Sequence, residues 1–388
     1  MKKTILLMNT TLGTGGISAS MINTANELSK EYDVSIFCFL PDGALKNRLK
    51  SGVKVIGSSW RLEALCLTIQ DAKKRGIKYF LFKAFAHIWS ILFTNRFPIY
   101  LAIKHQKKLG TFDLACSYTH ESSKRIEYTG LIRVLLKKVD SKTKLSWVHC
   151  DYSKLPKSKF NNRYFNKCSA IVGCSSSVAN VFKECHPQVT TKIDYCYNMI
   201  DYDMVFSKCL EKCDIKFNDN GIVCFSACRL TKIKAVDRMI ESCAEIFKKN
   251  NAFWYIAGDG PEKNNIIELI KKHNLEDRVI LLGEQTNPFK YIKNSDLYLS
   301  VSYEEAAPLV YFEAKALHVP VFSTRTLSTE ELLNKDVDFI CENDANSIAI
   351  AFDSATSSKK ELEDRKEKLN SYVGNNNQPF SFFKKYLG

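Results

Sequence analysis

The segment from Ser300 to Thr324, SVSYEEAAPLVYFEAKALHVPVFST, carries two glutamates that are well spaced to bind one long ligand. Its pattern predicts a buried strand, a turn containing Glu305, a helix containing Glu313, and a second strand. The turn would lie at the carboxyl end of a strand, where open α/β sheets bind ligands. Glu313 would lie about two helical turns further on, roughly 12 Å at 1.5 Å per residue. Two such carboxylates can accept hydrogen bonds from hydroxyl groups at two points of the same ligand.

The start of this predicted helix could bind an anion between the two carboxylates. Backbone amides at a helix N-terminus point outward and favour negative charge. We expect these contacts along Ala306, Ala307, Pro308, Leu309 and Val310. Hydroxyl-binding carboxylates on both sides of an anion site suit a sugar nucleotide.

The Glu305/Glu313 pair resembles the E-x7-E signature of retaining GT-B glycosyltransferases of family 4, which includes capsule, exopolysaccharide and lipopolysaccharide enzymes. Two glutamates at a fixed spacing also occur by chance on surface helices, so the resemblance depends on further motifs in the expected order. It implies that Glu313 binds the nucleoside ribose and that Glu305 contacts the transferred sugar near its reacting carbon.

Two further motifs of the C-terminal half match the same family. RLTKIKAVDRMI resembles its R-L-x-x-x-K-G passage, which implies that Arg229 and Lys234 bind the donor diphosphate. An arginine fork and a lysine point charge at a strand-to-helix turn can converge on one anion, although two surface cations are the plainer alternative. Ala235 stands where the family usually has glycine. The G-D-G-P passage also matches and assigns Gly258 to the donor site.

A glycine-rich loop, TTLGTGG, follows the first predicted strand KTILLMN. Gly13, Gly15 and Gly16 would let the backbone present its amides to phosphate, and a simple tight turn is the alternative. The family resemblance implies that Gly15 and Gly16 face the donor phosphates.

The segment WVHCD closes a later predicted strand and resembles the family's WIH-x-D segment. The resemblance implies that His149 faces the donor sugar and that Asp151 lies on the acceptor side. A histidine at a strand end can also be a hydrogen-bonded structural residue. The passage NMID, with Asn198 and Asp201, resembles the family's connection between its domains.

Charge and length limit the possible partners. The 388 residues suffice for two domains, and 45% hydrophobic residues indicate a globular protein. A formal net charge of +14 indicates an anionic partner: nucleic acid, an acidic membrane surface or phosphorylated substrates. No nucleic-acid-binding motif accompanies the charge, so we expect no nucleic-acid partner.

Residues 71–110 contain nine Lys or Arg, one acid and eight aromatic residues. No apolar run reaches the roughly 20 residues of a membrane span. Helical spacing of the aromatics fits amphipathic helices on an anionic membrane surface, and equally fits aromatics that face the core beneath a solvated basic surface. Both alternatives stay open.

We expect no metal and no cofactor, because the sugar nucleotide is itself a substrate. Cys209, Cys213, Cys224 and Cys228 have a zinc-like spacing, but the last two share a predicted strand and would lie about 13 Å apart. Asp201 and Asp203 spell D-x-D within the predicted connection between domains, where we do not expect metal ligation. Fourteen cysteines without a secretion signal predict a cytoplasmic protein.

The predicted fold is therefore α/β with GT-B architecture: two Rossmann-like doubly wound domains facing a cleft. The predicted domains are residues 1–197 on the acceptor side and 198–370 for the donor. The resemblance implies that a tail helix in residues 371–388 crosses back to the first domain.

The family resemblance implies retaining transfer of a sugar from a nucleoside diphosphate, UDP by preference, to a hydroxyl acceptor, and we expect it to be metal-independent. The acceptor would be a lipid-linked glycan or polysaccharide of a bacterial surface, with the enzyme peripheral on the inner face of the membrane. Two alternatives stay open: a UDP-sugar 2-epimerase on the same fold, and a non-catalytic subunit that only binds sugar nucleotides.

Overall fold

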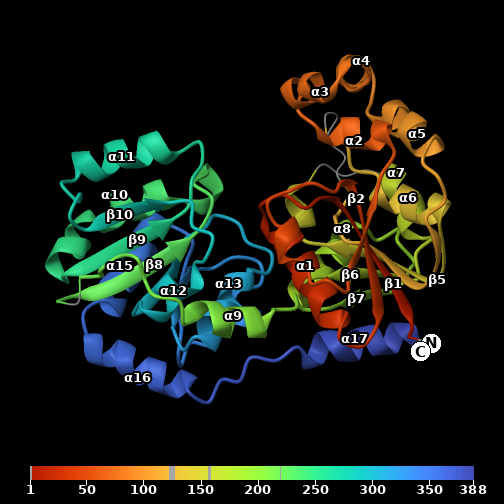
Figure 1. Ribbon diagram of the computed structural model, residues 1–388. Coiled ribbons are helices and arrows are strands. Elements are labelled where there is room, and N and C mark those ends of the chain that lie inside the picture. Colours follow the sequence, from red (N-terminus) through yellow and green to blue (C-terminus); the bar gives the residue numbers. More distant parts are fainter. Residues whose placement is uncertain (1, 122–126, 156–158, 219) are drawn as a thin grey trace. The chain divides into compact units, whose positions relative to one another are not determined.

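A computed structural model describes residues 2–121, 127–155, 159–218 and 220–388 (Figure 1). The chain forms two compact units. The first runs to Ile200 and takes up the chain again from Asn376 to Gly388, and the second is Asp201–Asn375. The predicted boundaries, after residues 197 and 370, lie a few residues before these divisions.

The first unit is built on a seven-stranded parallel sheet with the order β3-β2-β1-β4-β5-β6-β7. Successive residues of β1 point to opposite faces, so Ile5 and Leu7 enter one hydrophobic core while Leu6 and Met8 enter the other. Burial on both faces explains why the central strands are almost wholly apolar. The strands are β1 (Thr4–Thr11), β2 (Asp33–Leu40), β3 (Lys54–Gly57), β4 (Gly110–Ser117), β5 (Val139–Val148), β6 (Ala170–Gly173) and β7 (Ile193–Tyr195).

Helices cover both faces of this sheet. They are α1 (Gly16–Leu28), α2 (Trp60–Cys66), α3 (Ile69–Arg75), α4 (Ile77–Leu92), α5 (Arg96–Lys104), α6 (Leu131–Lys138), α7 (Lys159–Phe165), α8 (Ser176–Cys185) and α17 (Asn377–Leu387). The predicted return of the C-terminal tail is confirmed, because α17 packs Phe382 and Phe383 into the core of the first unit. The Phe383 ring stacks on Trp147 with 5.8 Å between centroids, and Lys385 pairs with Asp194 at 2.7 Å.

The second unit has a six-stranded parallel sheet with the order β10-β9-β8-β11-β12-β13. Its strands are β8 (Ile222–Ala227), β9 (Ala252–Ala257), β10 (Val279–Gly283), β11 (Leu297–Ser300), β12 (Val321–Thr324) and β13 (Phe339–Cys341). Its helices are α9 (Tyr202–Cys209), α10 (Val236–Lys249), α11 (Lys263–Lys272), α12 (Phe289–Lys293), α13 (Leu309–Ala316), α14 (Thr329–Leu332), α15 (Ala345–Ala355) and α16 (Lys359–Leu369).

Both sheets have a point where the strand order reverses, which is where open α/β sheets bind ligands. In the first unit it lies between β1 and β4, and in the second between β8 and β11. The glycine-rich loop follows β1, and the loops carrying Arg229 and Glu305 follow β8 and β11. The candidate residues thus emerge at the edges that the topology assigns to ligand binding.

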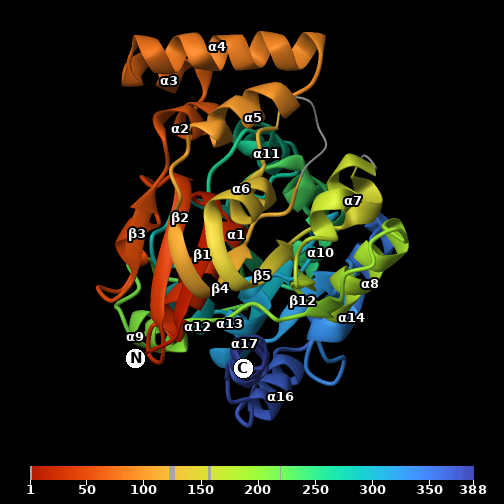
Figure 2. The ribbon, with the colours of Figure 1, turned by 90° about the vertical axis from the view of Figure 1, so that its right-hand side faces the viewer.

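The basic, aromatic stretch of residues 71–110 is helical, as predicted, and Figure 2 shows α4 lying across α2 and α5. Its small and polar residues Ala86, Ser90 and Lys83 face inward, and the Lys83 ammonium donates to the Leu65 carbonyl at 2.8 Å. Its aliphatic residues Ile77, Leu81, Ile88, Ile91 and Leu92 are exposed, whereas Phe82 packs against the core. Among the helices that the structure describes, none combines the length and apolar character needed to cross a membrane.

Candidate functional site

The centre of the candidate site is an ion pair between Lys234 and Glu305 in the second unit. Lys234 ends the short 3-10 helix η3 (Lys232–Lys234) after β8, and Glu305 lies in the turn after β11. The two loops are joined by the amide of Tyr303, which donates to the Ile233 carbonyl at 2.8 Å. The sequence separates these two side chains by 71 positions, and the reversal of strand order brings them together.

This ion pair is partly shielded from water, with side-chain exposures of 29% for Lys234 and 16% for Glu305. Burial alone would lower the pKa of Lys234, but the adjacent Glu305 carboxylate raises it above its ordinary value. The Ser302 hydroxyl donates a second hydrogen bond to the same carboxylate at 2.8 Å. The site therefore holds a charged ammonium and an oriented carboxylate at one edge of the sheet.

Arg229 adds a second cation on the loop after β8. Its side chain is exposed and forms no hydrogen bond or ion pair with the residues that the structure describes. The loop itself is held by the Leu230 amide, which donates to the Asp259 carbonyl at 2.9 Å. An arginine on a fixed loop with no protein partner is suited to bind an anionic ligand.

Gly258 supports this arrangement through its backbone. Its φ is 150°, and a Cβ there would lie 1.8 Å from the Cys228 carbonyl oxygen. Gly260 is similar, since its Cβ would lie 2.3 Å from the Leu230 carbonyl oxygen. These glycines are needed because two loops approach each other closely, which gives Gly258 a positioning role. Its predicted contact with a donor stays a prediction.

Ala235 stands at the position where the resembled family has glycine. It is fully buried and adopts the left-handed conformation, with φ 52° and ψ 34°, between η3 and α10. That conformation costs a residue with a side chain about 1–2 kcal/mol. The turn is nevertheless formed, so the alanine does not displace Lys234 from Glu305.

The helix that carries Glu313 follows a turn that holds Glu305, as predicted. It begins at Leu309 with Pro308 before it, so Ala306 and Ala307 belong to the preceding turn and not to the helix. Glu313 is its fifth residue and lies just over one turn inside, where the sequence predicts about two. Pro308 helps to fix this start, because its fixed φ favours the first turn of a helix or the residue just before it.

Glu305 and Glu313 nevertheless lie near a common neighbour, Tyr298 on β11. Burial is the main cause that raises the pKa of this phenol, and the charges of Cys228, Glu313 and Glu305 add to it. The Tyr298 hydroxyl accepts from the Ala227 amide at 3.0 Å, which fixes it between β8 and β11. Both carboxylates therefore belong to the same edge of the sheet.

Sequence reasoning missed two residues that position the Glu305 turn. Arg238 on α10 is buried and donates to the Val301 carbonyl at 2.8 Å and to the Asn343 side chain at 2.8 Å. The Asn343 amide in turn donates to the carbonyl of Tyr303 at 3.1 Å. An arginine among the apolar positions of α10 was the available signal, but its partner is 105 positions away.

In the first unit, the glycine-rich loop leaves space for a ligand. Gly15 precedes α1 with φ 155°, and a Cβ on Gly15 or Gly16 would meet nothing within 4 Å. Asn9 on β1 fixes both ends of the loop. Its side-chain amide donates to the Thr11 carbonyl at 3.0 Å and to the Ser18 hydroxyl at 3.3 Å. The open space is compatible with the predicted phosphate contacts, which stay a prediction.

His149 directly follows β5, as predicted, and its ring packs against Tyr118 with 4.9 Å between centroids. Its Nε2 atom is buried and has no hydrogen-bond partner within the described part of the chain. Burial, with a smaller effect of His120, lowers the pKa of His149 to about 3. Asp151 has a local partner instead, because its carboxylate caps η2 (Tyr152–Lys154) by accepting from the Ser153 amide at 2.9 Å.

The buried neutral state of His149 predicts a loss of stability in acid. Its pKa is about 3 in the folded chain against 6.5 for an ordinary histidine, so the unfolded chain binds the extra proton as pH falls below 6.5. We expect this residue to cost up to about 1.4 kcal/mol of unfolding free energy per pH unit. Urea unfolding at pH 7, 6 and 5 should show a flatter pH dependence for His149→Gln than for wild type, whereas His87→Gln on α4 should follow wild type.

Asp201 has a structural role within the second unit. Its side chain caps α9 by accepting from the Met204 amide at 3.1 Å.

Cys224 is buried in the core, and Cys228 follows the end of β8.

The second unit also matches a known family. Residues 210–372 match the family described as "Glycosyl transferases group 1". The chain is 31% identical over 153 residues to the N-acetyl-alpha-D-glucosaminyl L-malate synthase of Bacillus anthracis, covering 39% of this chain and 40% of that protein. It is 33% identical over 148 residues to the N-acetylgalactosamine-N,N'-diacetylbacillosaminyl-diphospho-undecaprenol 4-alpha-N-acetylgalactosaminyltransferase of Campylobacter jejuni, covering 38% and 39%. Each match thus spans about two-fifths of the relative's length.

Solved structures share the fold over nearly the whole chain. Staphylococcus aureus TarM has a TM-score of 0.68 at 14% identity, covering 100% of this chain and 99% of that one. Anabaena HepE in complex with UDP has a TM-score of 0.65 at 15% identity, covering 99% of each chain. Together with the two doubly wound parallel sheets, these similarities confirm the predicted GT-B architecture.

Proposed function

We propose that this chain, a GT-B protein whose second unit matches the group 1 glycosyl transferases, moves a sugar from a nucleoside diphosphate donor to a hydroxyl acceptor. The observation that carries the proposal is the Lys234–Glu305 pair beside Arg229 at the reversal of strand order. Two cations suit the diphosphate, and an oriented carboxylate suits the sugar. The family match and the relatives' names support the same conclusion.

In the proposed reaction the enzyme stabilises developing charge and forms no covalent bond to the sugar. The bond between the anomeric carbon and the diphosphate oxygen breaks, and the acceptor oxygen bonds to that carbon from the same face. Attack on this face retains the configuration at the anomeric carbon, and the acceptor proton passes to the leaving diphosphate. Arg229 and Lys234 stabilise the charge that develops on the diphosphate and so take the part that a divalent ion plays elsewhere. Glu305 supports the positive charge that develops on the sugar.

Other residues receive binding roles in this proposal. Glu313 binds the ribose hydroxyls, and Gly15 and Gly16 approach the phosphates where their backbone is open. His149 is neutral at physiological pH, so its Nε2, which has no hydrogen-bond partner among the described residues, can form a hydrogen bond with a sugar hydroxyl. UDP is the proposed nucleotide, supported by Anabaena HepE, which is described in complex with UDP.

One experiment separates this proposal from its alternatives. Purified protein is incubated with UDP-sugars, with and without candidate acceptors, and both UDP and the sugar are followed. A transferase releases UDP and forms a product linkage that depends on the acceptor. An epimerase changes the sugar without an acceptor, and a binding subunit changes nothing.

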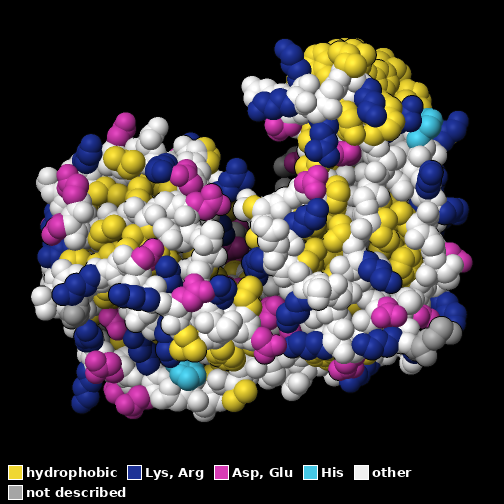
Figure 3. All heavy atoms as spheres, in the orientation of Figure 1, with side chains coloured by type: hydrophobic (Ala, Val, Ile, Leu, Met, Phe, Trp, Pro, Cys, Tyr) yellow, Lys and Arg dark blue, Asp and Glu magenta, His cyan; other side chains and the backbone are white. Residues whose placement is uncertain are grey.

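We further propose that the acceptor is lipid-linked and that the protein works at the inner face of a membrane. The Campylobacter jejuni relative supports this, since its name states a diphospho-undecaprenol-linked acceptor. The first unit presents a suitable surface, which Figure 3 shows as the hydrophobic area over α4. On α4 the side chains of Ile77, Leu81, Ile88, Ile91 and Leu92 follow one helical face and are 53–71% exposed. We call these five residues the α4 stripe.

Charges near the α4 stripe favour an anionic membrane. Lys73, Lys74 and Lys78 are exposed beside it, whereas Arg75 is paired with Glu63 and with Asp42. Each exposed cation near an anionic surface contributes about 1 kcal/mol. An apolar face with basic neighbours lies flat in the headgroup region of a bilayer.

The protein should therefore co-sediment with vesicles that contain phosphatidylglycerol at low salt. We expect Ile88→Asn combined with Leu92→Asn to abolish most of this binding, because both side chains would enter the interface. Replacing Lys73, Lys74 and Lys78 by Gln should weaken it and reduce its salt dependence. The matched control is Ile350→Asn, an isoleucine 64% exposed on α15. Equal binding by all variants, or none by wild type, would make a water-soluble acceptor the better hypothesis.

A further inference from the structure

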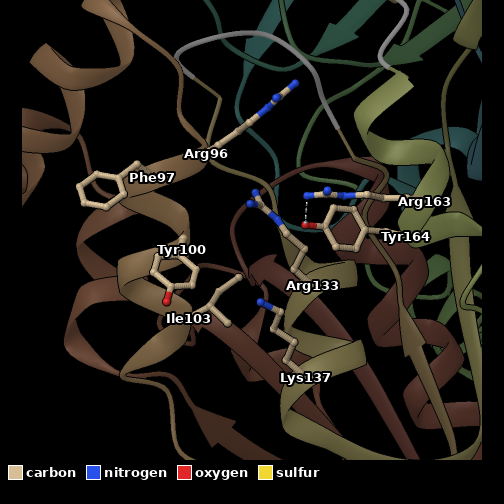
Figure 4. Close-up of a pocket in the computed structure, with 8 residues that line it drawn as sticks. All are labelled: Arg96, Phe97, Tyr100, Ile103, Arg133, Lys137, Arg163 and Tyr164. Carbon is tan, nitrogen blue, oxygen red and sulfur yellow. Dashed lines mark hydrogen bonds between the residues drawn. The ribbon is translucent and has the colours of Figure 1, made fainter.

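A cavity in the first unit brings together four cationic side chains. It has a volume of about 330 Å³ and is lined by Arg96, Arg133, Lys137 and Arg163, which come from α5, α6 and α7 (Figure 4). No aspartate or glutamate is among the described residues that line it. Arg133 is only 8% exposed, whereas the other three cations are exposed to solvent. The cavity is therefore an electropositive pocket with one cation at its base.

The positive charge of the Arg133 guanidinium is only partly balanced by the groups around it. Burial lowers its pKa, the Glu121 carboxylate partly offsets this effect, and the nearby Arg96 and Arg163 lower it further. Glu121 is already engaged behind it, accepting from the amides of Gly130 at 3.1 Å and Ile132 at 3.0 Å. Like charges that are held together repel, and a ligand carrying two or more negative charges would relieve the repulsion.

Aromatic rings hold these cations at the wall of the pocket. The Arg163 guanidinium lies over the Tyr164 ring at 4.9 Å and donates to the Tyr164 hydroxyl at 3.0 Å. The Lys137 ammonium lies 5.6 Å from the centre of the Tyr100 ring. Guanidinium groups fixed in this way present their N–H donors as forks, the geometry that suits phosphate oxygens.

The pocket continues into the apolar surface of α4. Phe97 lines the pocket, and its ring packs against Trp89 of α4 with 4.8 Å between centroids. The Phe97 ring also packs edge-on against the Phe85 ring, with 6.5 Å between centroids. Phe85 lies on the same helical face as the α4 stripe. Phe97 and Tyr100 are themselves 40% and 48% exposed. A strongly basic pocket and an exposed apolar face therefore share one border.

We propose that this pocket binds the phosphate or diphosphate group of a membrane lipid whose chain lies along the α4 stripe. The inference rests on the proposed function in one respect: the lipid would be the acceptor substrate, held by its phosphate while its sugar end receives the transferred residue. The ligand class is an isoprenoid or acyl phosphate ester, recognised by four cations at its charged group and by aromatic and aliphatic side chains beside it. Neither half of the surface would bind such a lipid as well alone.

The test uses farnesyl diphosphate as probe and measures its binding to the full chain by calorimetry. Farnesol and inorganic diphosphate are the comparison ligands. The test variant carries Arg96→Gln, Lys137→Gln and Arg163→Gln, which are exposed side chains, and leaves the buried Arg133 in place. The control carries Lys54→Gln, Lys142→Gln and Lys183→Gln, three exposed lysines of the same unit that do not line the pocket.

Wild type and control should bind farnesyl diphosphate, and the test variant should bind it at least tenfold more weakly. Farnesol and inorganic diphosphate should each bind at least tenfold more weakly to wild type, and the test variant should keep wild-type affinity for UDP. Displacement of farnesyl diphosphate by UDP, equal affinity for inorganic diphosphate, or equal loss in the control overturns the inference. If farnesyl diphosphate binds as expected but no sugar nucleotide releases UDP, the proposed sugar transfer is refuted, and the proposed lipid-phosphate site in the pocket is supported.

Discussion

Lys234→Met is expected to lower the turnover of sugar transfer by about 10²–10³-fold, the effect of removing one donor that stabilises developing charge. The ammonium is positioned by Glu305 and is partly buried, so water cannot fully replace it. Methionine keeps an unbranched side chain that is one atom shorter and removes its charge. Steady-state release of UDP in the presence of acceptor measures the effect.

Lys232→Met is the matched control for this prediction. Lys232 lies in the same 3-10 helix, but its side chain is exposed. We expect nearly wild-type turnover from this variant. Arg229→Gln should also reduce turnover, and it should raise the donor KM because its fork would contact the diphosphate. Strict dependence of wild-type activity on added Mn²⁺ would contradict the assignment of both cations.

The sequence predicted those parts of the site that are local to one strand and the loop after it. Lys234 and Glu305 each follow a buried apolar strand, and the order of strands along a doubly wound sheet then brings their loops together. Gly258 was assigned through the G-D-G-P passage, and the structure shows the physical reason for glycine at 258 and 260, which is the close approach of another loop's backbone. Short continuous apolar runs predicted the strands, because both faces of a parallel sheet are buried, and the resemblance to a known family predicted the architecture.

Features that depend on distant residues could not be predicted in this way. Arg238 and Asn343 are hydrogen-bonded although 105 positions separate them in the sequence, so no local pattern predicts this contact. The pocket beside α4 is built from three separate helices, so its cations look like isolated surface residues in the sequence. The direction in which α4 faces was likewise open, because amphipathic spacing shows that a helix has two faces and does not show which face is covered.

Glu305→Gln is the second variant for which we expect a large effect, about a 10²-fold loss of turnover with little change in the donor KM. Glutamine keeps the shape and can still accept from the Ser302 hydroxyl, but it cannot support positive charge on the sugar. Glu313→Ala provides the contrast. If Glu313 binds the ribose, its loss should raise the donor KM and leave turnover nearly unchanged.

The free energy of unfolding measures the contribution of the Lys234–Glu305 ion pair independently of activity. Each single substitution leaves a partly buried charge without its partner. We expect Glu305→Gln and Lys234→Met each to lower the free energy of unfolding by about 1–2 kcal/mol, between the values for exposed and buried ion pairs. The double variant should lose less than the sum of the two, since it removes both charges together. Additive losses in urea unfolding, with wild-type turnover in Glu305→Gln, would show that the ion pair neither orients Lys234 nor serves the reaction.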